Sequence, residues 1–250
     1  MKALEQFGQY CLLLYRSLRS LYEVNTYKKN LINELLKIGY ESVPIVLLTG
    51  VFTGAVMTIQ TAYQLDMAFV PLSVIGSITS ESLLIELSAV ITSLVLAGKV
   101  GARISTELGT MRVSEQIDAL ESMGFNSVSF LVLPRVLAGL VMFPLLYIFA
   151  SVSGMIGGVV AGYLSGAISP TEFMLGARQF FYPWDVTFGI LKAFVFGYVI
   201  TSISCFKGYY ATGGAEGVGT STTQATVLSC IYVLLADFVL AAVVHRHLDL

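Results

Sequence analysis

Charged residues are scarce in this chain. Of its 250 residues, 12% are Asp, Glu, Lys or Arg, whereas 56% are hydrophobic. A soluble domain usually carries about twice this charged share, because its surface must face water. The shortage argues against a soluble enzyme or binding domain and indicates an integral membrane protein.

Other features are missing as well. The three cysteines and two histidines show no metal or redox spacing, and the formal net charge of −2 argues against a nucleic-acid partner. The short alternating segments of a membrane β-barrel are absent; the apolar runs are continuous instead. A helix satisfies all its backbone hydrogen bonds within itself in lipid, so the sequence predicts an all-α membrane protein.

Five apolar runs are long enough to be transmembrane helices, although the second is short for a hydrocarbon core of ~30 Å. They cover about 43–63, 83–100, 136–164, 186–206 and 223–244. We therefore expect a transmembrane domain over 41–250, preceded by a separate region over 1–40.

Residues 1–40 carry a different pattern. Phe7, Cys11, Leu14 and Leu18 repeat at alternating steps of four and three, while Arg16 and its neighbours face elsewhere. This spacing predicts an amphipathic helix in the headgroup region, with its apolar face toward the lipid. A helix packed on another protein is the alternative.

The longest polar interruption is 101–135. Inside it, Gly109 and Gly124 bracket a segment in which Val113, Ile117 and Leu120 follow helical spacing. The pattern predicts a short amphipathic helix between two spans, offered to a partner. A plain surface loop is the alternative.

Basic residues set the expected orientation. If the N-terminus is cytoplasmic, the cytoplasmic side receives most of the lysines and arginines, and the opposite side only Arg178 and Arg246. The region 101–135 and the glycine-rich break 207–222 are then both cytoplasmic. The C-terminus lies on the other side.

Two ionisable residues fall well inside predicted spans, where a charge is costly. From the helical rise, Lys192 and Asp237 each lie ~9 Å from the outer face. We predict that they form an ion pair, directly or through water. The alternatives are a snorkelling lysine and a protonated aspartate.

Glycine recurs at four-residue spacing in two spans, a pattern that permits close helix packing. Glycine is also simply commoner in membrane helices, which is the alternative. The predicted packing residues are Gly50, Gly54, Gly154, Gly158, Gly162 and Gly166.

One long motif carries a family resemblance. The run LAGKVGARISTELGTMRVSEQIDALESMG, followed by Pro134-Arg135, resembles the signature of the MlaE/YrbE family, and GGAEGVGTSTTQATV from Gly213 is similar to that family's second cytoplasmic motif. The resemblance covers the chain from about Asn30 onward. One departure is Ser88-Ala89, where the family usually has Gly-Pro. A proline there would kink the start of the second span, so the family's helix shape is not carried over to this position.

The resemblance implies a permease subunit of a lipid-transporting ABC transporter in the bacterial inner membrane. Its implied partners are a second copy of itself, a cytoplasmic ATPase that holds ATP and Mg, a periplasmic MCE-domain ring and, in some systems, a STAS-domain regulator. This chain itself would hold no cofactor and no catalytic centre. Segment 107–124 would be the coupling helix, with candidate contacts at Glu107, Arg112, Glu115, Asp118 and Glu121.

The implied substrate is a phospholipid, in a system concerned with outer-membrane lipid asymmetry. Its cavity would lie at the dimer centre and open toward the periplasm. The candidate lipid contacts are Phe52, Met57, Ile59, Tyr63, Leu65 and Glu86. A sterol or a fatty acid is the alternative substrate.

Two other function classes fit less well. An ion-driven secondary transporter using Lys192 and Asp237 would bring internal repeats and matching broken helices, which the sequence does not show. An intramembrane enzyme would need clustered carboxylates or histidines, whereas His245 and His247 stand alone near the tail.

Overall fold

The computed structural model describes residues 2–19, 28–65 and 71–248, and all regular structure within them is helical. Five continuous helical stretches are long and apolar enough to cross a membrane. They cover Lys28–Leu65, Ser73–Val113, Val128–Leu164, Pro183–Tyr209 and Gly214–Val243. The prediction of an all-α membrane protein with five spans is confirmed.

The helical stretches run further than the apolar runs. The second is built from α4 (Ser73–Ser82), α5 (Ser88–Leu96) and α6 (Ala102–Val113), joined by the π-helical segments η3 (Leu83–Leu87) and η4 (Ala97–Gly101). A third π-helical segment, η5 (Val128–Val132), leads into α8 (Leu133–Leu164). Thus α6 carries the helix well into the polar region that was expected to lie outside the span.

The chain divides into two compact units, which we describe separately. The first unit contains 1–41, 96–142 and 194–250, and the second contains 42–95 and 143–193. The division cuts through several of the long helices.

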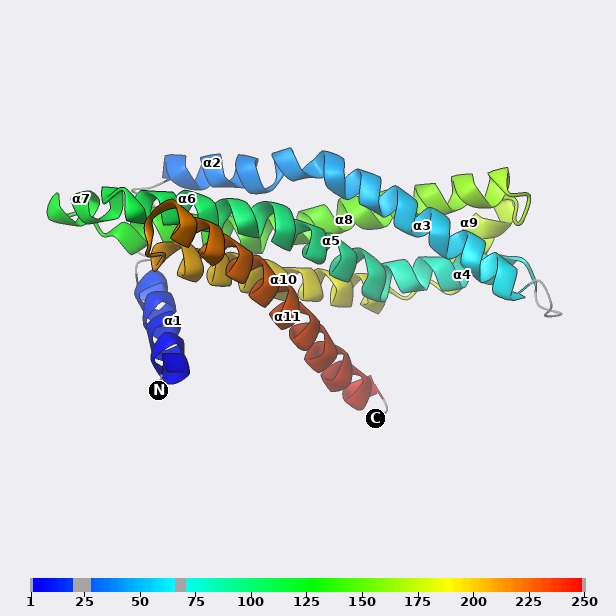
Figure 1. Ribbon diagram of the computed structural model, residues 1–250. Helices are drawn as coiled ribbons and strands as arrows, with labels where there is room; N and C mark the ends of the chain where they lie inside the picture. Colours follow the sequence, from blue (N-terminus) through cyan, green and yellow to red (C-terminus); the bar gives the residue numbers. More distant parts are fainter. Residues whose placement is uncertain (1, 20–27, 66–70, 249–250) are drawn as a thin grey trace. The chain divides into compact units, whose positions relative to one another are not determined.

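In the first unit, α11 (Gly214–Leu248) packs against α6 (Figure 1). Small residues allow this approach, because a Cβ added to Gly109 would lie 3.3 Å from Val218. The end of α10 (Pro183–Tyr209) comes closer still, since a Cβ on Gly208 would lie 2.7 Å from the carbonyl oxygen of Ser105.

The predicted interfacial region forms two helices, α1 (Lys2–Arg19) and α2 (Lys28–Ile38). The Tyr10 hydroxyl of α1 lies 2.9 Å from Ser202 Oγ, and its ring meets that of Phe206 edge-on at 5.5 Å. Phe7 and Leu18, from the predicted apolar stripe, stay exposed. Helix α1 therefore packs on its own unit through one face and leaves a second apolar face uncovered.

In the second unit, α3 (Val43–Leu65) packs on α8 through glycine. A Cβ on Gly54 would lie 1.8 Å from the carbonyl oxygen of Gly154, and one on Gly50 would lie 2.1 Å from Ser153 Oγ. Gly157, which the four-residue spacing did not single out, would meet the Val51 carbonyl oxygen at 2.1 Å. The two backbones are therefore in contact, and no larger residue fits between them.

The glycine series on α8 is shorter than predicted. A Cβ on Gly158 would meet Thr58 Oγ1 at 2.6 Å, and one on Gly162 would meet Ile168 at the same distance. The inclusion of Gly166 is wrong, because it lies beyond the end of α8 with φ at 71° and has open space around it. Gly166 ends the helix, a role that the left-handed conformation favours.

Helix α9 (Pro170–Gln179) lies between α8 and α10 in the sequence. Ser169 and Glu172 form a capping box at its start, with Pro170 in the first turn. The helix packs against α4 in the second unit.

Candidate functional site

The segment 107–124 contains two helical pieces. Helix α6 ends at Val113, the chain turns at Ser114 and Glu115, and α7 covers Gln116–Ser122. Glu115 has φ at 59°, a left-handed conformation that costs a residue other than glycine about 1 kcal/mol. The predicted short helix is present as α7, but it begins only after this turn, so that Val113 of the predicted stripe lies on α6. Of its predicted apolar stripe, Ile117 is fully buried, whereas Val113 is exposed.

An ion pair spans this turn. Arg112 Nη1 donates to Asp118 Oδ1 at 2.7 Å. Both side chains are more than a third exposed, at 35% and 54%. The pair therefore adds little stability by itself. Glu115 is also exposed. These three predicted contact residues face outward from the segment.

Glu121 is held by two hydroxyl groups. Ser127 Oγ donates to Glu121 Oε1 at 2.6 Å, and the Tyr209 hydroxyl donates to the same oxygen at 3.0 Å. The hydrogen bond from Ser127 is the main reason that the pKa of Glu121 lies below its usual value. The contacts join the end of α7 to the end of α10.

Glu107 belongs to a larger cluster of charges, which we call the ionic network. Arg135 Nη2 lies 3.1 Å from Glu107 Oε2, and Arg135 Nε lies 3.5 Å from Glu34 Oε1. The network contains three acidic and three basic side chains, so their formal charges cancel. Its members are Glu34, Lys37, Glu41, Arg103, Glu107 and Arg135.

The network connects three helices. Arg103 Nη1 of α6 lies 3.0 Å from Glu41 Oε2 and 3.1 Å from the carbonyl oxygen of Lys37 in the last turn of α2. Arg135 lies in the first turn of α8. Positive charge near the C-terminal carbonyls of a helix is favourable. Through these contacts α6, in which segment 107–124 begins, is connected to both α2 and α8.

Sequence analysis missed most of this network. The sequence pattern of residues 1–40 did not indicate that Glu34 is buried, yet its side chain is 9% exposed, and that of Arg135 is 6% exposed. Buried charges need partners. An available signal was Arg135 itself, because an arginine directly after Pro134 at the start of an apolar span requires a carboxylate nearby.

A second charged site lies in the second unit. Lys192 is completely buried, and its Nζ lies 2.5 Å from Glu86 Oε2 and 4.8 Å from the centre of the Phe188 ring. Glu86 had been predicted to contact lipid at the cavity rim; the structure pairs it with Lys192. Asp237 belongs to the first unit, and its pairing with Lys192 stays a prediction.

The π-helical segment η3 supplies Glu86. In the same segment, the Leu84 carbonyl oxygen accepts a hydrogen bond from the Tyr147 hydroxyl at 2.7 Å. Gly189 permits the close approach of α10, since a Cβ there would lie 2.1 Å from the Tyr147 oxygen. The helix is irregular just before Ser88-Ala89, the position of the family departure, and Ser88 itself has helical angles. Such π-helical segments are frequent at functional sites.

The remaining lipid candidates lie on α3. Phe52 is exposed, and Met57 is half-buried. Ile59, Tyr63 and Leu65 line a hollow of ≈ 210 Å³ together with residues of α4 and of the turn after α8. Typical small-molecule pockets measure about 300–1,000 Å³, so this hollow could take part of one acyl chain but not a whole two-tailed lipid.

Comparison with known proteins identifies the family. The family model described as Permease MlaE matches residues 31–243. A probable ABC transporter permease protein of Rickettsia bellii is 36% identical over 236 residues, which cover 94% of this chain and 91% of that protein. A second, from Synechocystis, is 40% identical over 214 residues, covering 86% of this chain and 81% of that protein.

A plant relative is also similar. The protein named TRIGALACTOSYLDIACYLGLYCEROL 1, chloroplastic, of Arabidopsis thaliana is 38% identical over 214 residues, covering 86% of this chain and 61% of that protein. The family match over most of the chain confirms the resemblance found in the sequence motifs. An ABC transporter permease implies a partner ATPase subunit. The chain is therefore a multi-pass membrane protein that belongs to the MlaE family of ABC transporter permeases.

Proposed function

We propose that this chain is the membrane subunit of an ABC transporter that moves phospholipid between the inner membrane and the periplasm. In this proposal two copies form a dimer, and each binds an ATPase through segment 107–124 on the cytoplasmic side. The N-terminus is cytoplasmic and the C-terminus periplasmic. ATP and Mg belong to the ATPase.

The attachment of segment 107–124 is the observation that carries the coupling role. Its first part is fixed by Glu107 in the ionic network, and its last part by Glu121 on Ser127 and Tyr209. Arg112, Glu115 and Asp118 lie between these two points in the sequence, and their side chains are at least partly exposed. A projecting segment fixed at both ends can pass the motion of a bound partner to the helices behind it.

A lipid substrate is supported by two features of the second unit. A lipid needs apolar surface for its tails and polar groups for its head. Exposed apolar residues such as Phe52 and Ile59 follow α3, and the Glu86–Lys192 pair provides charge inside an apolar span. The plant relative carries the name of a diacylglycerol lipid, which agrees with this substrate class.

The remaining partners follow from the family resemblance. A periplasmic ring of MCE-domain subunits would receive or deliver the lipid, and a STAS-domain protein would regulate the ATPase. Both are parts of the proposal.

Reconstitution tests the proposal directly. The permease is purified with its ATPase, placed in vesicles, and assayed for ATP-dependent transfer of labelled phospholipid, with labelled sterol and fatty acid as parallel substrates. We expect phospholipid transfer to dominate. A complex that transfers only sterol or fatty acid would contradict the substrate, whereas a permease that binds no ATPase would contradict the coupling role.

Asp118→Lys isolates the docking surface, because it reverses a charge on the outward face without touching the ionic network. We expect weaker ATPase binding. The matched control is Glu5→Lys, which reverses an exposed charge on α1 and should leave ATPase binding unchanged. Equal ATPase binding by both variants would contradict docking on segment 107–124.

A further inference from the structure

Large aromatic side chains gather where α9 passes into α10. They occupy residues 180–184, interrupted only by Pro183, and each is about half exposed. They are Phe180, Phe181, Tyr182 and Trp184, with exposures of 45%, 50%, 60% and 51%. Such a run of exposed rings needs a partner, because soluble surfaces rarely leave so much apolar area in contact with water.

Helix α9 presents an apolar face next to these rings. Its other face is fixed on α4, since a Cβ on Gly176 would lie 1.8 Å from the Ser73 carbonyl oxygen and one on Gly76 would lie 2.3 Å from the Phe173 carbonyl oxygen. This contact leaves Met174 and Leu175 exposed. The outward direction of α9 is therefore set by backbone contact on its inner side.

This surface carries one exposed basic side chain beside the acidic Glu172 and Asp185. Glu172, the acidic residue of α9, is engaged in the capping box, where its carboxylate accepts from the Ser169 backbone N–H at 3.2 Å. Arg178 in the last turn is exposed. An arginine is well suited to bind the phosphate groups of lipid heads.

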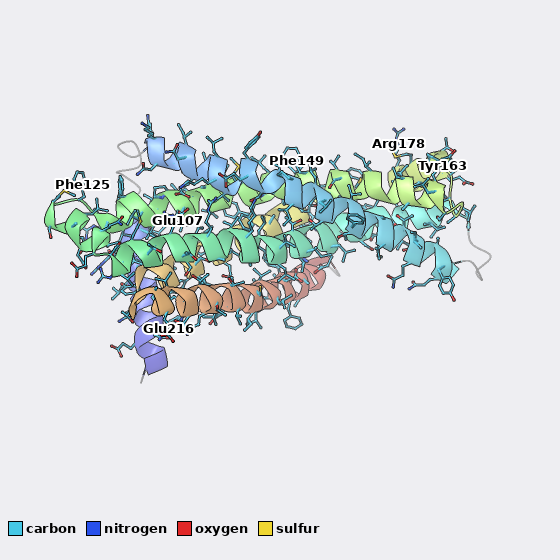
Figure 2. All side chains as sticks on the ribbon, turned by 45° about the horizontal axis from the view of Figure 1, so that its top comes forward. Glu107, Phe125, Phe149, Tyr163, Arg178 and Glu216 are labelled. Atoms are coloured by element: carbon cyan, nitrogen blue, oxygen red, sulfur yellow. The ribbon has the colours of Figure 1, made fainter. Side chains whose placement is uncertain are left out.

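Aromatic residues also mark the neighbouring helix ends of the second unit. Tyr63 in the last turn of α3 is 84% exposed, and Tyr163 in the last turn of α8 is 65% exposed. The ends of α3 and α8 lie together, because the end of α3 and the turn directly after α8 line the same hollow with the start of α4. Figure 2 shows Tyr163 and Arg178 at the same end of this unit. The rings thus form a band across several helix ends instead of one concave patch.

We propose that α9 and residues 180–184 lie in the lipid–water interface, as an aromatic anchor that fixes this end of the second unit in the bilayer. Tyrosine and tryptophan concentrate at the headgroup level, where an apolar ring with a polar tip fits best. Met174 and Leu175 enter the acyl boundary, and Arg178 faces the phosphates, as in other interfacial helices. A flat lipid surface matches a band of rings better than a protein partner does.

The single tryptophan makes a direct test possible. Trp184 is the one tryptophan in the chain, so the intrinsic tryptophan fluorescence of the full-length permease reports on this position alone. The permease is reconstituted in vesicles whose lipids carry bromine either close to the headgroup or close to the end of the acyl chain. We expect the shallow bromines to quench Trp184 more strongly, and aqueous acrylamide to quench it less than it quenches free tryptophan.

Two variants calibrate the depth. Trp184→Phe combined with Tyr163→Trp moves the probe to another member of the band and should reproduce the shallow profile. Trp184→Phe combined with Phe149→Trp moves it to the exposed middle of α8 (Figure 2) and should reverse the order, with the deep bromines quenching more.

Strong acrylamide quenching of Trp184 without any effect of brominated lipid would overturn the proposal. So would acrylamide quenching that disappears only when a periplasmic protein is added, because the band would then be a protein-docking surface. Neither result depends on whether the transporter moves phospholipid, so this test is independent of the proposed function.

Discussion

Two sites of this permease compensate their buried charges in different ways. The ionic network of the first unit spreads five charges over α2, α6 and α8, and the sixth, Glu41, lies in the turn after α2. Each buried member has more than one opposite charge within 4.0 Å. In the second unit, Lys192 is completely buried and meets Glu86 at 2.5 Å. A shared network should tolerate the loss of one member, whereas a close pair should not, because the remaining charge loses its main compensation.

The largest expected effect is at the close pair. In Glu86→Gln the buried ammonium of Lys192 loses the carboxylate that lies 2.5 Å away, and breaking a buried pair costs about 3–5 kcal/mol. Since Glu86 is 40% exposed, we expect about 2–3 kcal/mol. The measurement is unfolding by SDS in mixed micelles.

The double variant Glu86→Gln/Lys192→Met is the control for this prediction. Removing both charges should restore much of the lost stability, because the buried lysine is removed together with the carboxylate that it contacts. A double variant as unstable as the sum of the two single variants would show that the pair is not the unit of stabilisation.

Arg135→Gln should have a smaller effect on stability. Glu107 keeps Arg103 at 3.6 Å and Lys37 at 3.8 Å, and Glu34 keeps Arg103 at 3.9 Å. We expect a loss of about 1–2 kcal/mol, below the range for a buried pair without substitutes. A loss of stability larger than that of Glu86→Gln would show that the network does not tolerate the loss of one member better than the close pair does.

The same variant separates stability from coupling. Arg135 connects α6, in which segment 107–124 begins, to α8. Its loss should therefore reduce the lipid moved per ATP hydrolysed in the reconstituted complex. Lysine in its place carries the charge but not the two-sided guanidinium contact. Compared with Arg135→Gln, we therefore expect Arg135→Lys to regain more of the stability than of the lipid moved per ATP hydrolysed.

The contrast between the sites also explains which features could be predicted from the sequence. The spans followed from continuous apolar runs, because lipid demands them. The network partners Glu34 and Arg135 lie far apart in the sequence, and nothing near Glu34 indicates that it is buried. Depth from the membrane face marked Lys192 as needing a carboxylate, but depth alone did not point to Glu86, which lies 2.5 Å from it.

Local geometry set a second limit. A π-helical segment such as η3 has the same apolar composition as the α-helix around it, so its position leaves no composition signal. Gly166 repeats the spacing of Gly158 and Gly162, yet it falls two residues beyond the end of α8 and ends the helix. Likewise, the left-handed turn at Glu115 interrupts a helical pattern without a glycine to mark it.

A surface member of the network should matter least for stability among the charged pairs. Glu41 contacts Arg103 at 3.0 Å, but its side chain is 55% exposed. Glu41→Gln should cost about 0–1 kcal/mol, in the range of exposed pairs. Its effect should also vanish in high salt, whereas that of Arg135→Gln should persist, because buried charges are screened less. Equal salt sensitivity of the two variants would contradict the graded burial of the network.

Glu121 extends the comparison to a carboxylate whose nearest partners are neutral hydroxyl groups instead of cations. The hydrogen bond from Ser127 holds the pKa of Glu121 below its usual value of 4.5. A carboxylate with a lowered pKa in the folded state adds stability that is complete above 4.5 and is lost as the pH falls through the folded-state pKa. Ser127→Ala should therefore be less stable than the native chain at neutral pH, and the difference should shrink in acid. Glu121→Gln is the control, because a side chain that cannot ionise should remove this pH dependence. A difference between native and Ser127→Ala that stays constant through the acid range would show that Ser127 acts by packing and not through the charge of Glu121.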